Sequence, residues 1–361
     1  MTGTALRGAA VVGGGSLART ICYSLATQTE QPIAEVTVAA RSAQAAREIA
    51  AIANARAAVS SCPTRFTADV LDAAQPTAVA RFLEHVRPGI VVNCASLQSP
   101  WESAQAASAW TRLLAEGGFG IGLPLHAVLA RELASAIRRS GLPTAFVNAC
   151  YPDAVNPLLA AEGLPVLCGV GNVATLAATL RAALRTRDGE QLRVMAHHLH
   201  LHRPADPADE VRAWLGKDPV PDVGELLAVH RSCSRAELNE VTGHAAAQFL
   251  ARLSAGQDIR TDLPGPLGLP GGYPVRAQGR QITLDLPDGV TRSEAVSWQQ
   301  RMAEQDGVVV SPAGEIRLGP QAASAVATHL PGLPEHYDIR TFRKLTRELL
   351  LLREKLRTTP A

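Results

Sequence analysis

Three glycines near the start of the chain could hold a phosphate group. Residues 10–20 read AVVGGGSLART, and Gly13, Gly15 and Ala18 fit the spacing GxGxxA. In this pattern the first glycine permits a tight turn, the second lets the backbone approach a pyrophosphate, and the small third residue lets a helix pack on a sheet. Ser16 and Leu17 would open that helix, whose free amides and dipole attract phosphates. The motif predicts a dinucleotide site; the alternative is a purely structural turn.

The end of the next apolar segment bears on which dinucleotide is bound. An acidic residue there would accept hydrogen bonds from the adenosine ribose hydroxyls and favour NAD. The segment VTVAARS carries Arg41 and Ser42 instead. Arg41 could pair with a 2′-phosphate and Ser42 could hydrogen-bond to it. We therefore expect NADP. If Arg41 is only a surface residue and Ser42 only a helix cap, NAD stays open.

A run of histidines, HHLHLHR over residues 197–203, is the most conspicuous polar cluster. We predict a strand here, in which His198, His200 and His202 share one face. Such a face could ligate a metal, supply a proton donor or carboxylate binder, or simply be a solvated sheet face. No acidic or cysteine partner can be assigned, so we predict no metal. If one histidine acts, His198 or His200 is favoured because both lie inside the strand.

The segment NACYPDAVNP over residues 148–157 could also do chemistry. Tyr151 could donate a proton, Asp153 could pair with a substrate amine, and Asn148 could orient a polar substrate. The same residues are equally typical of a turn in which Asp153 caps the following helix. Further on, GPLGLPGGYPV could form a loop over the site, with Tyr273 reaching into a cleft, or it could only connect two domains.

Alternating strands and helices must position these residues. Short apolar runs rich in Val, Ile and Ala predict five strands, at residues 8–13, 35–41, 65–70, 89–96 and 144–150. Helical periodicity predicts helices between them, at residues 16–27, 42–55, 75–88 and 123–141. Strands that are apolar throughout and separated by helices are typical of a parallel sheet covered on both faces. We expect an α/β fold with a doubly wound (Rossmann) sheet.

The second half of the sequence is patterned differently. It mixes helical segments with two expected hairpins, at residues 275–287 and 308–318, and ends in a helix at about 338–357. A leucine stripe on that helix predicts core packing, with a subunit interface as the alternative. We expect an α+β domain and place the boundary near Tyr151. The predicted domains are residues 1–150, which bind the dinucleotide, and 151–361, which bind substrate and form a homodimer.

Composition excludes several classes of protein. The 361 residues are 47% hydrophobic and 19% charged, with 35 basic and 33 acidic residues, so the net charge of +2 gives no electrostatic footprint for nucleic acid. The sequence contains no run of eighteen apolar residues, so we expect no membrane span, and its N-terminus lacks the pattern of a signal peptide. We therefore expect a cytoplasmic protein. Its six cysteines form no CxxC pair, which favours buried reduced thiols over disulfides or zinc.

The first hundred residues resemble the nucleotide domain of saccharopine-dehydrogenase-like oxidoreductases. The resemblance rests on the glycine loop, the Arg-Ser after strand two, the Asp-Val after strand three and the Asn-Cys-Ala after strand four. It implies that Asp69 and Val70 edge the adenine. It also implies that the segment of Asn93, Cys94, Ala95 and Ser96 runs beside the ribose and nicotinamide. For the reaction, it suggests carbon–nitrogen chemistry on an amino or keto acid.

A second segment, TAFVNACYPDAVNPLLAAEGLPVLCGVGN, is similar to lactate and malate dehydrogenases. In that family a strand ends in Asn-Pro-hydrophobic-Asp, and a Gly-x-Gly strand follows the next helix. Asn148 and Asp153 stand in comparable places. The resemblance implies that residues 148–156 lie near the nicotinamide. The family then continues with an Asp and a carboxylate-binding Arg, whereas this chain reads NVATLAATLR.

Taken together, these features predict an NAD(P)-dependent oxidoreductase. It would transfer a hydride to or from a small amino-acid or keto-acid substrate, with imine reduction as one form of the reaction. The alternative is a non-redox protein on the same scaffold, either a nucleotide binder or a lyase or cyclase with tightly bound NAD(P).

Overall fold

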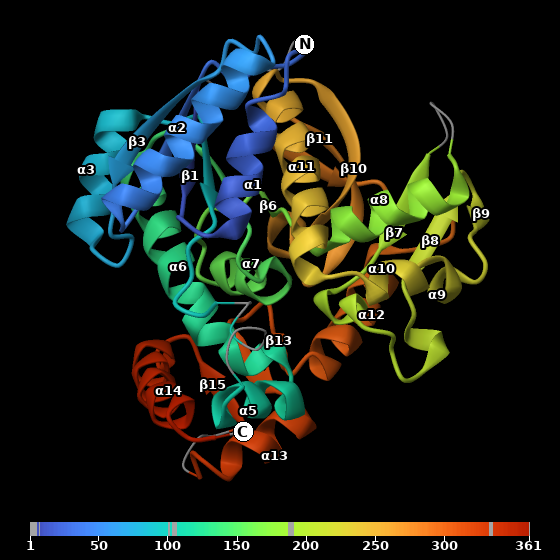
Figure 1. The fold of residues 1–361 in the computed structure, drawn as a ribbon. Coiled ribbons are helices and arrows are strands. Elements are labelled where there is room, and N and C mark those ends of the chain that lie inside the picture. The colour runs from blue at the N-terminus through green and yellow to red at the C-terminus, as the bar shows by residue number, and fades with distance from the viewer. Residues whose placement is uncertain are drawn as a thin grey trace.

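A six-stranded parallel sheet forms the centre of the protein (Figure 1). The computed structural model describes residues 6, 8–99, 102, 107–186, 191–331 and 335–360. The strands lie in the order β3-β2-β1-β4-β5-β6. Their bounds are Ala9–Val12 (β1), Glu35–Ala40 (β2), Arg65–Val70 (β3), Ile90–Asn93 (β4), Ala145–Asn148 (β5) and Cys168–Gly169 (β6).

Both faces of this sheet are buried. Side chains alternate along a strand, so Ala9 and Val11 enter one apolar core while Ala10 and Val12 enter another. The first core includes side chains from α1 (Ser16–Leu25) and α2 (Ala43–Val59). The second includes side chains from α3 (Pro76–Val86), α6 (Leu123–Ser140) and α7 (Pro152–Ala161). This is the doubly wound α/β arrangement that the sequence predicted, and strand order reverses between β1 and β4.

The sheet takes its sixth strand from beyond residue 151. Val147 and Asn148 of β5 pair in parallel with Cys168 and Gly169 of β6. A domain boundary at 151 stays a prediction, since the sheet itself continues past it.

The rest of the chain adds three small antiparallel sheets and further helices, as the α+β prediction for the second half required. The sheets are β7-β8-β9, β10-β11-β12 and β13-β14-β15. Their strands are Leu192–Met195, Arg212–Leu215, Asp218–Pro219, Asp258–Pro264, Gly272–Gln278, Gln281–Leu284, Val308–Val310, Glu315–Leu318 and His336–Asp338. The helices are α5 (Ala109–Gly117), α8 (Asn172–Leu184), α9 (Val223–Leu226), α10 (Ala228–Ser232), α11 (Arg235–Ser254), α12 (Arg292–Gln305), α13 (Pro320–Ala327) and α14 (Phe342–Arg357).

Two of these helices pack on the half of the chain that forms the parallel sheet. Helix α11 lies alongside α1 (Figure 1), and Thr20 of α1 faces Gly243 of α11. Helix α14 packs on α5 and α6, and its leucine stripe is buried within the chain: Leu345, Leu349, Leu352 and Leu356. The core-packing prediction for this stripe is therefore confirmed.

The prediction of a strand through the histidine run, residues 197–203, is wrong. Strand β7 ends at Met195, and His198–Leu201 form a short 3-10 helix, η2. The Leu199 amide donates to His197 Nδ1 and the His197 amide donates to His200 Nδ1. Imidazole rings that accept local backbone hydrogen bonds favour a turn over a sheet ladder. The residues His198, His200 and His202 thus do not share a sheet face.

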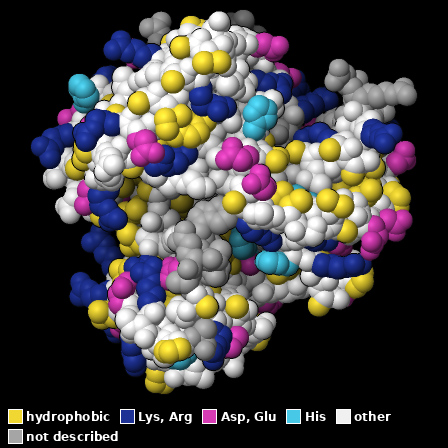
Figure 2. All heavy atoms as spheres, viewed as in Figure 1, with side chains coloured by type: hydrophobic (Ala, Val, Ile, Leu, Met, Phe, Trp, Pro, Cys, Tyr) yellow, Lys and Arg dark blue, Asp and Glu magenta, His cyan; other side chains and the backbone are white. Residues whose placement is uncertain are grey.

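Basic and acidic side chains are interspersed over the face of the molecule in Figure 2. Within the described part of the chain, no helix has the length and hydropathy needed to cross a membrane. The described cysteines are all free. Burial was predicted for them, and it holds for Cys22, Cys62 and Cys168, whereas Cys94 and Cys150 are half-buried and Cys233 is exposed.

We expect Gly243→Val to destabilise the protein. A Cβ at Gly243 would overlap the Thr20 side chain and lie 2.8 Å from the Thr20 carbonyl carbon, so α1 and α11 would have to separate. Overpacking of this kind costs about 1–3 kcal/mol. Urea denaturation of Gly243→Val and of His244→Ala, an exposed neighbour, measures the difference. Equal midpoints for the two variants would mean that the helices are not closely packed here.

Candidate functional site

A cavity of about 990 Å³ runs along the carboxyl ends of the six parallel strands. In a doubly wound fold this edge, next to the reversal of strand order, is where ligands bind. The loops after β1 to β6 line one side of the cavity with Gly13–Leu17, Ala39–Arg41, Leu71–Ala74, Cys94–Ser99, Ala149–Asp153 and Gly171. The opposite side is lined by residues of η2, α10 and α11, including His198, Leu201, His202, His230, Arg235, Leu238, Asn239 and Thr242.

The glycine loop has the geometry of an anion cradle. Gly13 has φ of 140°, and a Cβ there would lie 2.8 Å from the Cys94 carbonyl, so only glycine fits. Gly15 is the N-cap of α1 without a side-chain cap, and a Cβ there would meet nothing within 4 Å. The first amides of α1 therefore face open space, and Ser16 and Leu17 line the cavity beside them.

The ends of β2 and β3 place their predicted residues differently. Arg41 lines the cavity. Ser42 instead caps α2, where its Oγ accepts a hydrogen bond from the Ala45 amide. Asp69 and Val70 lie outside the cavity lining, and Leu71 and Asp72 line it at this strand end. Val70 is an exposed apolar residue of β3.

Asn93 and Asn148 are buried and position the loops rather than line the cavity. Asn93 Nδ2 donates to Asn148 Oδ1 at 3.0 Å, and Asn148 Nδ2 donates to Asn156 Oδ1 at 2.9 Å. Each also accepts a hydrogen bond from the backbone two residues on, at Ala95 and Cys150. This buried amide chain fixes the loops after β4 and β5, so that Cys94, Ala95 and Cys150 line the cavity.

The two cysteines at these strand ends are not reactive thiolates. Burial, with a smaller effect of Cys150, raises the pKa of Cys94 well above its usual value. Burial raises the pKa of Cys150 to about 12. Both thiols are therefore protonated at neutral pH, and they contribute small polarizable side chains to the wall.

The strongest acid–base arrangement at the cavity is the pair formed by His198, which lines it, and Asp306, which is buried and is not a lining residue. His198 Nδ1 lies 3.2 Å from both carboxylate oxygens of Asp306. Burial opposes the charged imidazole, but the Asp306 carboxylate outweighs it and raises the pKa of His198. Burial also opposes the charged form of Asp306 and would raise its pKa. The neighbouring imidazoles and the Tyr151 hydroxyl nevertheless hold that pKa below its usual value. The pair is therefore stable as imidazolium and carboxylate.

Tyr151 and Asp153 hold this pair in place. The Tyr151 hydroxyl donates to Asp306 Oδ2 at 2.8 Å, and Asp153 Oδ1 accepts a hydrogen bond from the His198 amide at 3.0 Å. Burial, followed by the Asp306 charge, raises the pKa of Tyr151 well above its usual value, so the phenol keeps its proton. Tyr151 adopts a left-handed conformation with φ of 46°, which is strained for a residue with a side chain. Both residues line the cavity and act through their contacts with the pair.

Aromatic side chains pack against the imidazole of His198. The Phe119 ring stacks on His198, with centroids 4.3 Å apart, and also contacts His126 and Tyr151. Burial, assisted by the His198 charge, lowers the pKa of His126 to about 3. His126 is therefore neutral, and its Nδ1 lies 3.0 Å from Ser96 Oγ. These side chains shield one face of His198 from water.

Two other candidates lie away from the cavity. His200 is fully buried, its Nδ1 accepts from the His197 amide, and its Nε2 donates to the Asp209 carbonyl at 2.7 Å. Tyr273 is also fully buried, in β11, so the loop before it does not cover the cavity. Across the described residues, no group of three His, Cys, Asp or Glu side chains converges in a way that could hold a metal.

Asp306 is the residue that sequence reasoning missed. It lies at the end of α12, 108 residues after its imidazole partner, and no motif marks it. The sequence offers only an indirect signal, the glycines Gly118 and Gly120. In the structure they lie close to the Asp306–Gly307 backbone, but glycines in a sequence do not identify the segment that they contact.

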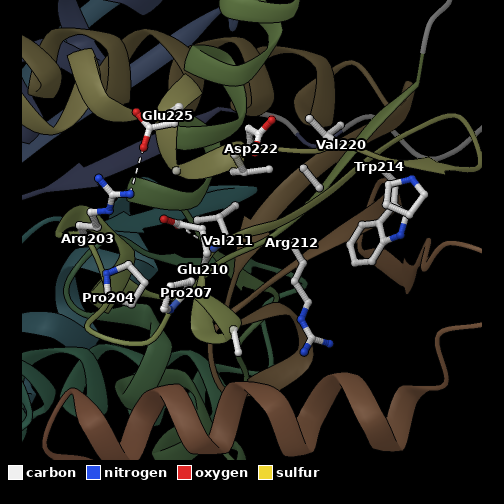
Figure 3. Close-up of a pocket in the computed structure, with 15 residues that line it drawn as sticks. Arg203, Pro204, Pro207, Glu210, Val211, Arg212, Trp214, Val220, Asp222 and Glu225 are labelled. Carbon is white, nitrogen blue, oxygen red and sulfur yellow. Dashed lines mark hydrogen bonds and ion pairs between the residues drawn. The ribbon is translucent and has the colours of Figure 1, made fainter.

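A second cavity, of about 440 Å³, lies in the β7-β8-β9 lobe (Figure 3). Three of its charged side chains form ion pairs: Arg203 with Glu225, and Glu210 with Arg231. None of its lining residues carries a buried polar atom without a partner within the described chain. We therefore take the larger cavity as the functional site.

Solved structures with the same fold include lactate and malate dehydrogenases. Malate dehydrogenase from Picrophilus torridus is 12% identical, with a TM-score of 0.54, over 90% of this chain and 99% of that one. Lactate dehydrogenase from Cryptosporidium parvum, complexed with lactic acid and nicotinamide adenine dinucleotide, is 12% identical, with a TM-score of 0.52, over 92% and 100%. Malate dehydrogenase from C. parvum is 14% identical, with a TM-score of 0.52, over 83% and 96%. This likeness shows the fold alone. No protein-family model and no curated protein matches the sequence.

We expect Asp306→Asn to lower the pKa of His198. Without the carboxylate, burial is the largest remaining influence on the imidazole and favours its neutral form, so the pKa falls. Titration of the imidazole by NMR measures the change, with the surface variant Asp338→Asn as control. An unchanged His198 pKa in Asp306→Asn would show that the two side chains are not coupled.

Proposed function

We propose that this protein is an NAD(P)-dependent oxidoreductase. Its substrate would be a small keto-acid or amino-acid compound whose C=O or C=N carbon accepts the hydride in one direction. The observation that carries the proposal is that one cavity is lined by both the glycine loop and His198, whose imidazole is paired with the buried Asp306. The fold likeness to lactate and malate dehydrogenases, one of them complexed with nicotinamide adenine dinucleotide, supports it.

The described residues fit a dinucleotide. The free amides of α1 and the open space at Gly15 suit a pyrophosphate. Arg41 would lie on the adenosine side and could pair with a 2′-phosphate, which favours NADP. The loops after β4 and β5 would flank the other end, as the resemblance to saccharopine-dehydrogenase-like and lactate-dehydrogenase-like proteins implies. A bound nicotinamide supplies or accepts the hydride.

His198 would move the proton. Its Nδ1 hydrogen is committed to Asp306, and because His198 lines the cavity we assign the transferred proton to Nε2, the other ring nitrogen. In reduction, imidazolium gives the Nε2 proton to the substrate oxygen or nitrogen while the carbon receives the hydride. In oxidation, the neutral imidazole takes this proton back. Asp306 stabilises the charged ring, Tyr151 and Asp153 orient it, and Phe119 limits water.

Gly15→Val tests the cradle. The added side chain would enter the space proposed for the pyrophosphate while touching nothing within 4 Å, so the fold should persist and cofactor affinity should fall at least tenfold. Gly13→Ala is the contrasting control, because its Cβ would strike the Cys94 backbone and cost stability. NADPH fluorescence and thermal melting separate the two effects. Unchanged NADPH affinity in Gly15→Val would remove the cradle.

Arg41→Ala tests the cofactor preference. Losing a charged partner of the 2′-phosphate should weaken NADPH binding about tenfold or more and leave NADH binding nearly unchanged. The exposed Arg47→Ala on α2 is a matched control. Equal effects on both cofactors would remove the argument for NADP.

Turnover distinguishes the proposal from its alternative. The protein with NADPH and a panel of 2-keto acids, with and without ammonia or amines, should oxidise NADPH, and His198→Asn should reduce kcat about a hundredfold or more. NADPH binding without turnover on any substrate would favour a non-redox protein on this scaffold.

A further inference from the structure

The wall opposite the strand ends contains a cationic residue without an acidic partner. Arg235, in the first turn of α11, lines the cavity and donates from Nη2 to the Leu201 carbonyl at 2.7 Å. Its Nη1 is buried and has no hydrogen-bond partner among the described residues. No carboxylate in the described chain forms an ion pair with it. A buried donor on a permanent cation is costly to leave unmade, so the site is complete only with an acceptor from outside the protein.

A second unmatched polar atom belongs to His230, which also lines the cavity and is 3% exposed. The Thr179 hydroxyl donates to the Thr175 carbonyl, so it accepts the hydrogen bond from His230 Nδ1 at 2.8 Å. The ring therefore carries its hydrogen on Nδ1, and burial keeps it neutral by lowering its pKa. His230 Nε2 is then a hydrogen-bond acceptor, and within the described residues it has no donor.

The hydroxyls beside these residues are already used. Thr242 Oγ1 donates to the Leu238 carbonyl, so it accepts from Thr175 Oγ1 at 2.7 Å. Among the described residues of this wall, the buried polar atoms left without a partner are therefore one cationic donor, Arg235 Nη1, and one neutral acceptor, His230 Nε2. This combination complements an anionic oxygen accompanied by an N–H or O–H group.

We propose that Arg235 binds the carboxylate of the substrate and that His230 accepts a hydrogen bond from an amide, amine or hydroxyl on the same molecule. The assignment rests on the proposed function in one respect, namely that the ligand is the hydride-exchanging substrate. It narrows the substrate class to acids that carry a second, hydrogen-donating group. In this proposal the arginine that binds the carboxylate lies on α11. Helix α8, which begins NVATLAATLR, carries no arginine in its first two turns.

The position of Arg235 favours substrate over cofactor phosphate. Its anchor, Leu201, belongs to η2, the same short helix that carries His198. One helical turn further along α11, Asn239 faces the glycine loop instead, donating to Ser16 Oγ at 2.7 Å. Successive turns of α11 thus face different parts of the cavity, and Arg235 belongs to the side of the acid–base pair.

Three matched probes test the proposal: malonate, its half-amide malonamate, and malonamide. Calorimetric titration into the full-length protein, with and without saturating NADPH, should rank malonamate first, because it alone offers both a carboxylate and an N–H donor. Arg235→Met should weaken malonate and malonamate about ten- to hundredfold and leave malonamide unchanged. Arg235→Lys should restore part of the loss. Arg252→Met, an exposed arginine on the same helix, should bind all three probes like the wild type.

His230→Phe should abolish the preference for malonamate over malonate, and thermal melting checks that this variant folds. If it does not fold, the preference of the wild type for malonamate over malonate tests the same point. The proposal is overturned if none of the probes binds, if malonamide binds as well as the acids, or if Arg235→Met changes NADPH affinity and not acid affinity. The protein could bind the acids through Arg235 and yet fail to bind NADPH. That result would support the carboxylate site and reject the proposed function.

Discussion

The buried carboxylate of Asp306 is the constraint on which the site depends. A carboxylate removed from water must be compensated by hydrogen bonds or opposite charge. Here His198 and Tyr151 supply both, from segments 108 and 155 residues away in sequence. The same contacts set the imidazole orientation, raise its pKa and hold Tyr151 in a strained backbone conformation. One buried charge thus links the strand-end loop, η2 and the end of α12.

Small residues allow these segments to meet. Gly118 and Gly120 let the Asp306–Gly307 backbone approach the Phe119 turn, and Gly243 lets α11 lie against α1. Because α11 is held so close to the glycine loop, its first turns reach the cavity and carry Arg235 there. Close backbone packing therefore determines which side chains face the strand ends, and it brings Arg235 and His198 to the same cavity as the glycine loop.

Much of the half that forms the parallel sheet followed from local patterns. Apolar strands, helical periodicity and the GxGxxA spacing predict parallel strands, covering helices and a cradle, because each of these signals lies within a few residues. The placement of Arg41 at the cavity followed from the same logic, whereas Asp69 and Val70 lie just outside the lining. The histidine run was assigned to a strand because alternation is also a strand signal. Its rings instead accept local backbone hydrogen bonds, which periodicity does not reveal.

By itself the sequence determined the doubly wound sheet, the glycine loop at its carboxyl edge and the presence of His198 among the candidates. The tertiary structure decided that His198 rather than His200 lines the cavity, that Asp306 is its partner, and that Tyr151 and Asp153 support it. It also brought Arg235 and His230 to the same wall. The physical reason is range: helix and strand formation depend on neighbouring residues, whereas the charge, burial and hydrogen bonding of a site depend on side chains brought together by packing.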